Sequence, residues 1–108
     1  MKNQMKTVVV GHRYDKLEML RRQIDLHCPH LNVTGAAGSP TNAYELIKES
    51  SPQVVFMEAE MPDQASFDLL DCFPNRNFIT VFVAENPESK LKAMKAGAFE
   101  FLIRPVSD

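Results

Sequence analysis

The 108-residue chain lacks three features that mark specialised classes of protein. It has no excess of basic residues, since 12 Lys and Arg stand against 14 Asp and Glu, so this chain alone offers no positive surface for a nucleic-acid backbone. No hydrophobic run approaches the roughly 20 residues that a membrane-spanning helix needs. The N-terminal segment has neither the apolar core nor the cleavage site of a signal peptide. We therefore predict a cytoplasmic protein with one domain, residues 1–108.

Cysteine is also scarce, and the two that are present form no recognisable motif. Cys28 and Cys72 make no CxxC pair, so we predict reduced thiols rather than a disulfide. Cys28 lies between His27 and His30, but Pro29 there indicates a helix end rather than a metal site. The chain has no Gly-rich loop after its first predicted strand and no Ser-His-Asp order, which argues against a dehydrogenase or a hydrolase. We predict that the chain is not an enzyme.

Short apolar runs alternate with helical patterns along the chain. The apolar runs predict strands at residues 7–10, 31–37, 53–58, 78–84 and 99–103. The helical patterns predict helices at residues 14–27, from Ser39-Pro40 onward, at 66–73, and from Asn86-Pro87 to Gly97. This alternation predicts an α/β fold with a parallel sheet and helices on both faces. No helix follows the fifth strand before Asp108, so we expect the final helix to be absent or truncated, or a partner to cover that face.

The residues at the ends of the predicted strands are the candidate site. In open parallel sheets, ligands bind at the carboxyl ends of the strands, near the point where the strand order reverses. The residues at those ends are Gly11, His12, Glu58, Ala84, Glu85 and Arg104.

Two segments resemble the receiver domain of bacterial response regulators. The segment VVFMEAEMPDQASFDLL (54–70) is similar to the family's phosphoacceptor segment, and KAMKAGAFEFLIRPV (92–106) is similar to its Ala-Gly-Ala…Lys-Pro ending. The resemblance implies a flavodoxin-like (CheY-like) three-layer sandwich with five parallel strands in the order 2-1-3-4-5. It also implies a role in two-component, phosphorelay signal transduction.

The chain departs from the family at every position that carries its chemistry. The family uses an acidic pair that holds Mg²⁺, a phosphoacceptor Asp, a Ser or Thr, and a Lys. The corresponding residues here are Gly11 and His12, Glu58, Ala84, and Arg104. Gly11 offers no ligand, and the His12 nitrogen is a poor ligand for Mg²⁺. Ala84 cannot donate a hydrogen bond, and the Glu58 side chain is one methylene longer than Asp. We therefore expect a degenerate phosphoacceptor site with no catalytic residue, no bound metal and no cofactor.

Glu58 and Arg104 should face one another across the strand ends. Arg presents a planar fork that suits a carboxylate, so we predict an ion pair in place of the metal, phosphate and lysine cluster. One interpretation is that the pair fixes one conformation and that Glu58 mimics the phosphorylated state. The other is that the pair is a relic in a decayed site, and the sequence leaves both open.

The second half of the chain supplies a candidate partner surface. In receivers, the surface of the fourth helix, the fifth strand and the fifth helix is the usual partner surface, so we expect dimerisation through the fourth helix, the fifth strand and the missing helix. By this resemblance, the predicted partner-binding residues are Lys90, Lys95, Phe99 and Phe101, although the lysines alone would also suit a solvated face. Glu100 predicts that the fifth strand lies at the edge of the sheet.

These observations predict a pseudo-receiver that acts as a phosphorylation-independent interaction or dimerisation module. The candidate partners are a second copy, a histidine kinase, an output domain or another protein, with no nucleic acid or membrane bound by this chain alone. Two alternatives remain open. The first is a phosphoacceptor that receives phosphate from a histidine kinase on Glu58 or Asp63. The second is a small-molecule sensor with an apolar or anionic ligand at the strand ends.

Overall fold

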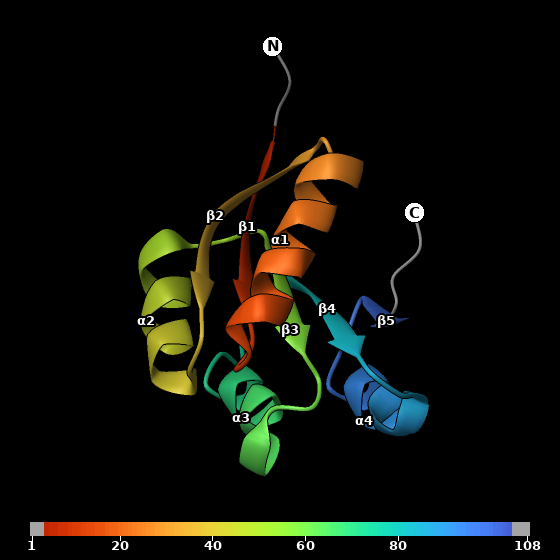
Figure 1. Cartoon of the computed structure of the whole chain (residues 1–108). Helices are drawn as coiled ribbons and strands as arrows, with labels where there is room; N and C mark the ends of the chain where they lie inside the picture. The colour runs from red at the N-terminus through yellow and green to blue at the C-terminus, as the bar shows by residue number, and fades with distance from the viewer. Residues whose placement is uncertain (1–3, 105–108) are drawn as a thin grey trace.

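Five strands and four α-helices alternate along residues 4–104, the part of the chain that the computed structural model describes (Figure 1). The strands are β1 (Met5–Val10), β2 (Leu31–Ala37), β3 (Val54–Glu58), β4 (Ile79–Ala84) and β5 (Glu100–Ile103). The helices are α1 (Tyr14–His27), α2 (Pro40–Ser50), α3 (Ala65–Asp71) and α4 (Lys90–Lys95), with 3₁₀ turns at Pro62–Gln64 and Pro87–Ser89. The predicted element order is confirmed, and no helix within residues 4–104 is long and apolar enough to cross a bilayer.

The sheet is parallel throughout, and its strand order is β2-β1-β3-β4-β5. Both the α/β class and the predicted order are therefore confirmed. All five residues of β3 are buried, as expected for the central strand of a covered sheet. β5 lies at the edge and exposes Glu100, as the sequence predicted.

The core is divided between the two faces of the sheet. On one face α1 packs Leu17, Leu20 and Ile24 against the sheet, and Figure 1 shows this helix lying across the strands. On the other face α2, α3 and α4 contribute Ile47, Leu70 and Ala93 to a second cluster. The three layers leave the carboxyl ends of the strands as the edge where loops from several elements meet.

Two predicted helix starts are confirmed by their caps. The Ser39 hydroxyl accepts a hydrogen bond from the Asn42 backbone N–H at 3.2 Å, and Pro40 occupies the first turn. Asn86 caps its helix in the same way, by accepting from Glu88. However, that segment begins with a 3₁₀ turn, so α4 is only six residues long. Gly97 follows α4 with a φ of +90°, a conformation that glycine adopts without strain.

The predicted end of the fifth strand falls partly outside the described residues. β5 ends at Ile103, and Arg104 follows it with its backbone N–H bonded to the Ala84 carbonyl at 2.8 Å. Pro105, which the sequence predicted to close this strand, lies outside the described residues. The chain end, on which the prediction of a missing final helix rests, does so too.

Candidate functional site

The parallel register brings the predicted site residues to one edge of the sheet. β1 ends at Val10, so Gly11 lies at the carboxyl end of that strand, bonded to the Ala37 carbonyl at the end of β2. Glu58 closes β3 and is paired with Val83 of β4. Arg104 continues β5 beside Ala84. Residues far apart in the sequence therefore meet at this edge.

Glu58 is the centre of this edge, and its carboxylate is buried. Its side chain is 5% exposed, and that of Arg104 is 11% exposed. Arg104 Nη1 lies 3.1 Å from Glu58 Oε2, so the predicted ion pair is confirmed. The other oxygen, Oε1, accepts the His12 backbone N–H at 3.0 Å and lies 3.4 Å from His12 Nδ1. Both oxygens of this buried carboxylate thus accept charge-assisted hydrogen bonds.

Gly11 provides the space that this carboxylate occupies. A Cβ atom at position 11 would lie 2.4 Å from Glu58 Oε1 and 2.7 Å from its Cδ, far inside van der Waals contact. The longer side chain of Glu58 fits at this position because residue 11 has no side chain. The sequence showed only that Gly11 has no side chain that could coordinate a metal ion. It gave no sign that Gly11 and Glu58 depend on each other.

A second layer of charges surrounds the Glu58–Arg104 pair. Arg104 Nη1 also lies 3.1 Å from Glu85 Oε2, and Glu85 pairs in turn with Lys16 of α1. Arg104 Nη2 donates to the Lys16 carbonyl at 3.5 Å. Glu60 accepts the Glu85 backbone N–H at 3.1 Å and 3.2 Å. Sequence reasoning had placed Glu85 among the strand-end residues and had missed Lys16, which lies inside a helix with no motif to distinguish it.

The electrostatic effect of this layer is clearest at Glu85. Hydrogen bonds from Lys16 and then from Arg104 lower the pKa of Glu85 below its ordinary value, against a smaller opposing effect of burial. The side chain is 45% exposed, so water screens these interactions.

The strand ends carry few side chains that could bind a metal ion or a phosphoryl group. A hollow of about 230 Å³ is lined by His12, Arg13, Lys16, Glu58, Glu60 and Glu85. Within the described part of the chain, no three His, Cys, Asp or Glu side chains are placed to hold a metal ion. Both Glu58 oxygens already have protein partners, so the donor set does not fit Mg²⁺. Ala84 is fully buried and carries no hydrogen-bond donor in its side chain.

The structure changes the predicted partner surface at one position. Lys90 and Lys95 are exposed, and Phe99 is 68% exposed. Phe101 is buried at 8%, because it pairs with Phe82 of β4 and is covered from the α4 side of the sheet. The prediction of Phe101 as a partner-binding residue is therefore wrong.

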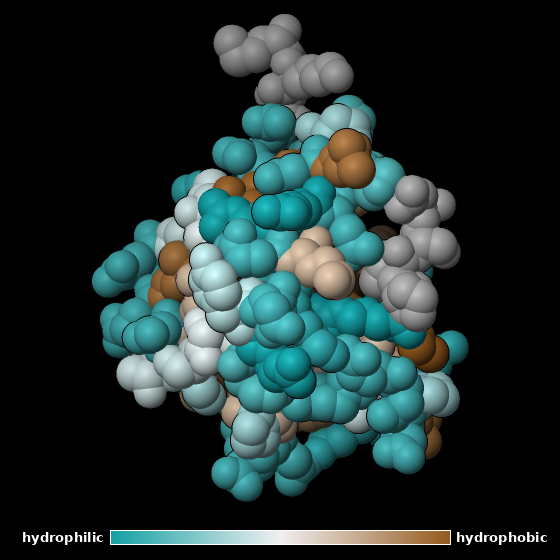
Figure 2. All heavy atoms as spheres, viewed as in Figure 1, coloured by the Kyte–Doolittle hydropathy of each residue, from teal (hydrophilic) through white to brown (hydrophobic). Residues whose placement is uncertain are grey.

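Other exposed apolar side chains on α4 and β5 were missed by sequence reasoning. Leu91 is 68% exposed, Met94 44% and Ile103 42%. Together with Phe99 they form what we call the α4–β5 patch. Figure 2 shows that the face carrying α1 is mostly hydrophilic, with hydrophobic atoms emerging at several places along its edges, among them the edge beside α4 and β5.

Comparison with known proteins gives relatives that are much longer than this chain. No family model matches the sequence. The chain is 30% identical over 95 residues to protein-glutamate methylesterase/protein-glutamine glutaminase 3 of Burkholderia thailandensis, which covers 83% of this chain and 26% of that protein. It is 27% identical over 93 residues to the corresponding protein of Yersinia pestis. The chain thus spans about a quarter of the length of the curated relatives it matches.

Solved structures share the fold. The response regulator domain of Thermotoga maritima CheB superimposes with a TM-score of 0.82 at 24% identity, covering 95% of this chain and 80% of that one. A LuxR-family DNA-binding response regulator from Staphylococcus aureus gives 0.82 at 19% identity, covering 95% and 88%.

The fold, the strand order and these neighbours define a class. The chain has the fold of response-regulator receiver domains, with five parallel strands in the order 2-1-3-4-5.

The dependence of Glu58 on Gly11 can be tested by a double-mutant cycle. We expect Gly11→Ala to lower the free energy of unfolding by about 1–3 kcal/mol, because the new methyl group displaces the buried carboxylate. In the Glu58→Asp background the same change should cost at least about 1 kcal/mol less, since the shorter side chain withdraws from position 11. Urea unfolding monitored by circular dichroism measures all four proteins.

Gly38→Ala is the matched control for this cycle, because a Cβ there meets nothing closer than the Gly11 carbonyl at 3.9 Å. Equal costs of Gly11→Ala in the two backgrounds would show that the two residues are independent.

The ion pair between Lys16 and Glu85 can be tested through the pKa of Glu85. Lys16→Gln should raise the pKa of Glu85 toward the ordinary value of 4.5, because it removes the main hydrogen bond that lowers this pKa. Since the folded pKa is lowered, the stabilisation is present above the unfolded value and is lost as the pH falls through the folded value. The loss should stay below about 1 kcal/mol at so exposed a group. NMR titration of the Glu85 side-chain carboxyl carbon measures the change, with Lys48→Gln on α2 as control, and an unaltered pKa in Lys16→Gln contradicts the assignment.

Proposed function

We propose that this receiver domain works without phosphorylation, as a pseudo-receiver that acts through protein–protein contact. The observation that carries the proposal is the enclosure of the Glu58 carboxylate by Arg104, His12 and Gly11. In the family that the sequence resembles, this position is the phosphoacceptor.

The enclosure leaves Glu58 poorly suited to accept a phosphoryl group. The accepting oxygen must be free to attack in line, and charge on the transferred group must be neutralised by positioned cations and donors. Here both oxygens are held within 3.1 Å by hydrogen-bond donors, and the side chain is 5% exposed. Ala84 adds no donor for a phosphoryl oxygen. We infer that ordinary aspartyl-phosphate chemistry is lost and that Mg²⁺ is not bound.

The same contacts support a fixed conformation over a decayed relic. Arg104 joins β3 to β5 through Glu58 and reaches α1 through the Lys16 carbonyl. Glu85 closes a second set of ion pairs around it. Movement of β5 would separate Arg104 from Glu58 and leave a buried carboxylate without its cation. We propose that the pair holds the end of β5 in one position, as a phosphoryl group and its lysine would in an active receiver.

The α4–β5 patch is the surface through which we propose that the domain acts. Leu91 and Met94 are exposed on α4 and Ile103 is exposed on β5, an edge strand that Phe99 directly precedes. Such a patch marks a site of protein contact when it is contiguous. Lys90 and Lys95 lie on the same helix, and Glu88 lies in the turn that leads into it. Charges of both signs beside an apolar patch suit a self-complementary, two-fold interface, so we propose a second copy of the domain as the partner.

If the function is independent of phosphorylation, the domain should not respond to phosphoryl mimics. Amide resonances of Gly11, Glu58, Ala84 and Arg104 should not shift when Mg²⁺ and then beryllofluoride are added, because the site is already filled by the Glu58–Arg104 pair. Two-dimensional ¹H–¹⁵N NMR of the labelled domain measures this.

The positive control replaces all five departures from the family pattern. The variant Gly11→Asp/His12→Asp/Glu58→Asp/Ala84→Thr/Arg104→Lys should bind Mg²⁺ and beryllofluoride if the fold alone is competent. Saturable shifts at these amides in the unmodified domain would contradict the proposal.

The interface proposal predicts self-association through the α4–β5 patch. The sedimentation coefficient of the domain should rise with protein concentration, and Leu91→Asp/Phe99→Asp should abolish the rise, because each change puts a charge into the apolar contact. Met19→Asp, at a 58% exposed position on α1, is the matched control and should leave the association unchanged. A domain that stays monomeric at all concentrations, or one that the patch variant does not affect, rules out a second copy as the partner.

A further inference from the structure

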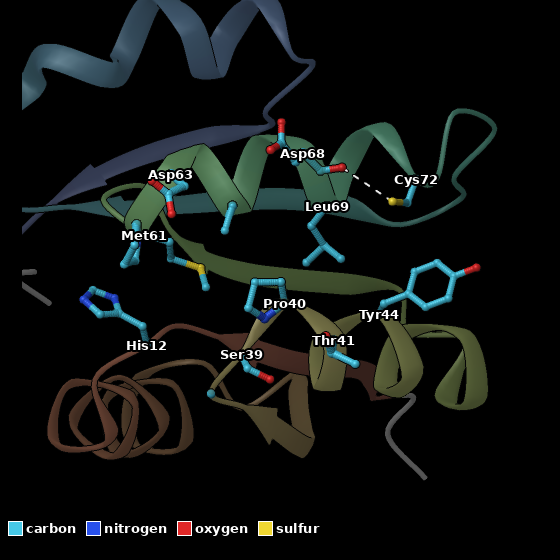
Figure 3. Close-up of a pocket in the computed structure, with 13 residues that line it drawn as sticks. His12, Ser39, Pro40, Thr41, Tyr44, Met61, Asp63, Asp68, Leu69 and Cys72 are labelled. Carbon is cyan, nitrogen blue, oxygen red and sulfur yellow. Dashed lines mark hydrogen bonds between the residues drawn. The ribbon is translucent and has the colours of Figure 1, made fainter.

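A larger hollow lies between α2 and α3, away from the Glu58–Arg104 pair. Its volume is about 700 Å³, which lies within the range of roughly 300–1,000 Å³ that is usual for small-molecule sites. Figure 3 shows the side chains of the two helices facing each other across it, with the turn that follows β3 at one end. None of Arg104, Glu85 and Lys16 lines it.

The walls of this cavity are mainly apolar. Met61 and Leu69 form its floor and are 5% and 4% exposed. Pro40 and Tyr44 line it from α2, and Ala65 lines it from α3. Apolar walls favour a ligand that carries apolar surface, because binding removes that surface and the wall from water.

The charge of the cavity has one sign. Its lining contains Asp63 and Asp68 and no Lys or Arg. In Figure 3 Asp63 and His12 lie at the same end of the cavity, on its two facing sides, whereas the Asp68 carboxylate points outward from α3. Within residues 4–104 no Lys or Arg forms an ion pair with Asp63. A carboxylate at the mouth of an apolar cavity attracts a positive group.

The backbone holds Asp63 in this place by an unusual conformation. Asp63 and Gln64 both have positive φ angles, 56° and 58°, although neither is glycine. Two such residues in succession cost free energy, which the surrounding structure must offset. Both residues belong to the 3₁₀ turn Pro62–Gln64, which follows Met61 and leads directly into α3.

From the cavity, its apolar floor and its free carboxylate, we propose that this site binds a small organic cation. The ammonium or guanidinium group lies beside Asp63, and the apolar body lies on Met61 and Leu69. The inference is independent of the proposed pseudo-receiver function, since it uses neither Glu58 nor the α4–β5 patch. It also differs from a sensor site at the strand ends, which the Glu58–Arg104 pair fills.

His12 lies between the two regions. It lines this cavity, and its backbone N–H donates to Glu58 Oε1 at 3.0 Å. Occupation of the cavity should therefore be detected at the His12 amide as well as at the cavity walls.

The test compares two probes of similar shape and opposite charge. Phenethylamine, as the ammonium, should shift the amides of Gly38, Thr41, Asp63 and Leu69 saturably in ¹H–¹⁵N NMR titration, whereas 3-phenylpropionate should not. Cys72 also lines the cavity and Cys28 does not, so bound phenethylamine should slow alkylation of Cys72 and leave that of Cys28 unchanged.

Two variants test separately the charge of Asp63 and the space inside the cavity. Asp63→Asn removes the charge but keeps a residue that tolerates a positive φ, and it should weaken binding about threefold to fivefold, as expected for an exposed charge pair. Thr41→Trp, at an exposed position on the rim, should fill the cavity and abolish binding. Asp25→Asn on α1 is the control for the first variant and should bind as the unmodified domain does.

Several outcomes would overturn the proposal. They are equal or tighter binding of 3-phenylpropionate, no saturable shift up to millimolar phenethylamine, or unchanged affinity in Thr41→Trp. None of them bears on the response to beryllofluoride, so the two proposals fail separately.

Discussion

A carboxylate removed from water has to be matched by hydrogen-bond donors, and in this domain that requirement falls on Glu58. An unpaired buried charge would cost several kcal/mol, so its partners cannot be lost without penalty. The donors come from the loop after β1 and from the end of β5, and Arg104 itself also donates to the Lys16 carbonyl in the first turn of α1. The hydrogen bonds to one buried carboxyl group therefore fix the relative positions of elements that are distant in the sequence.

Much of the fold could be predicted, because its signals are local and repeated. β-branched runs at 7–10 and 53–58 indicated buried strands, and the Ser39-Pro40 and Asn86-Pro87 pairs indicated helix starts that the structure confirms. The ion pair could be predicted as well, because parallel strands bring their carboxyl ends to one edge and Glu58 and Arg104 stand at two of those ends. The strand order rested on the family resemblance rather than on the physics of the chain.

What escaped prediction depends on three-dimensional packing. The resemblance gave Phe99 and Phe101 the same partner-binding role, but Phe101 is buried in the cluster beneath α4, whereas Phe99 is exposed. Lys16 has no distinguishing neighbours in the sequence, and its role follows from how α1 lies over the strand ends. The cavity between α2 and α3 depends on how far apart two helices lie, which no pattern within either helix records.

The close approach of Gly11 to Glu58 also limits how the sequence can change over generations. Any side chain at position 11 meets the Glu58 carboxylate. A shorter acid at position 58 would no longer reach both Arg104 and the His12 backbone N–H, which would each lose a hydrogen-bond acceptor. A change at position 11 alone or at position 58 alone is therefore expected to be unfavourable, although the two changes together need not be. The coupling that we predict between the two residues would make them an epistatic pair, in which the effect of a change at one depends on the residue at the other.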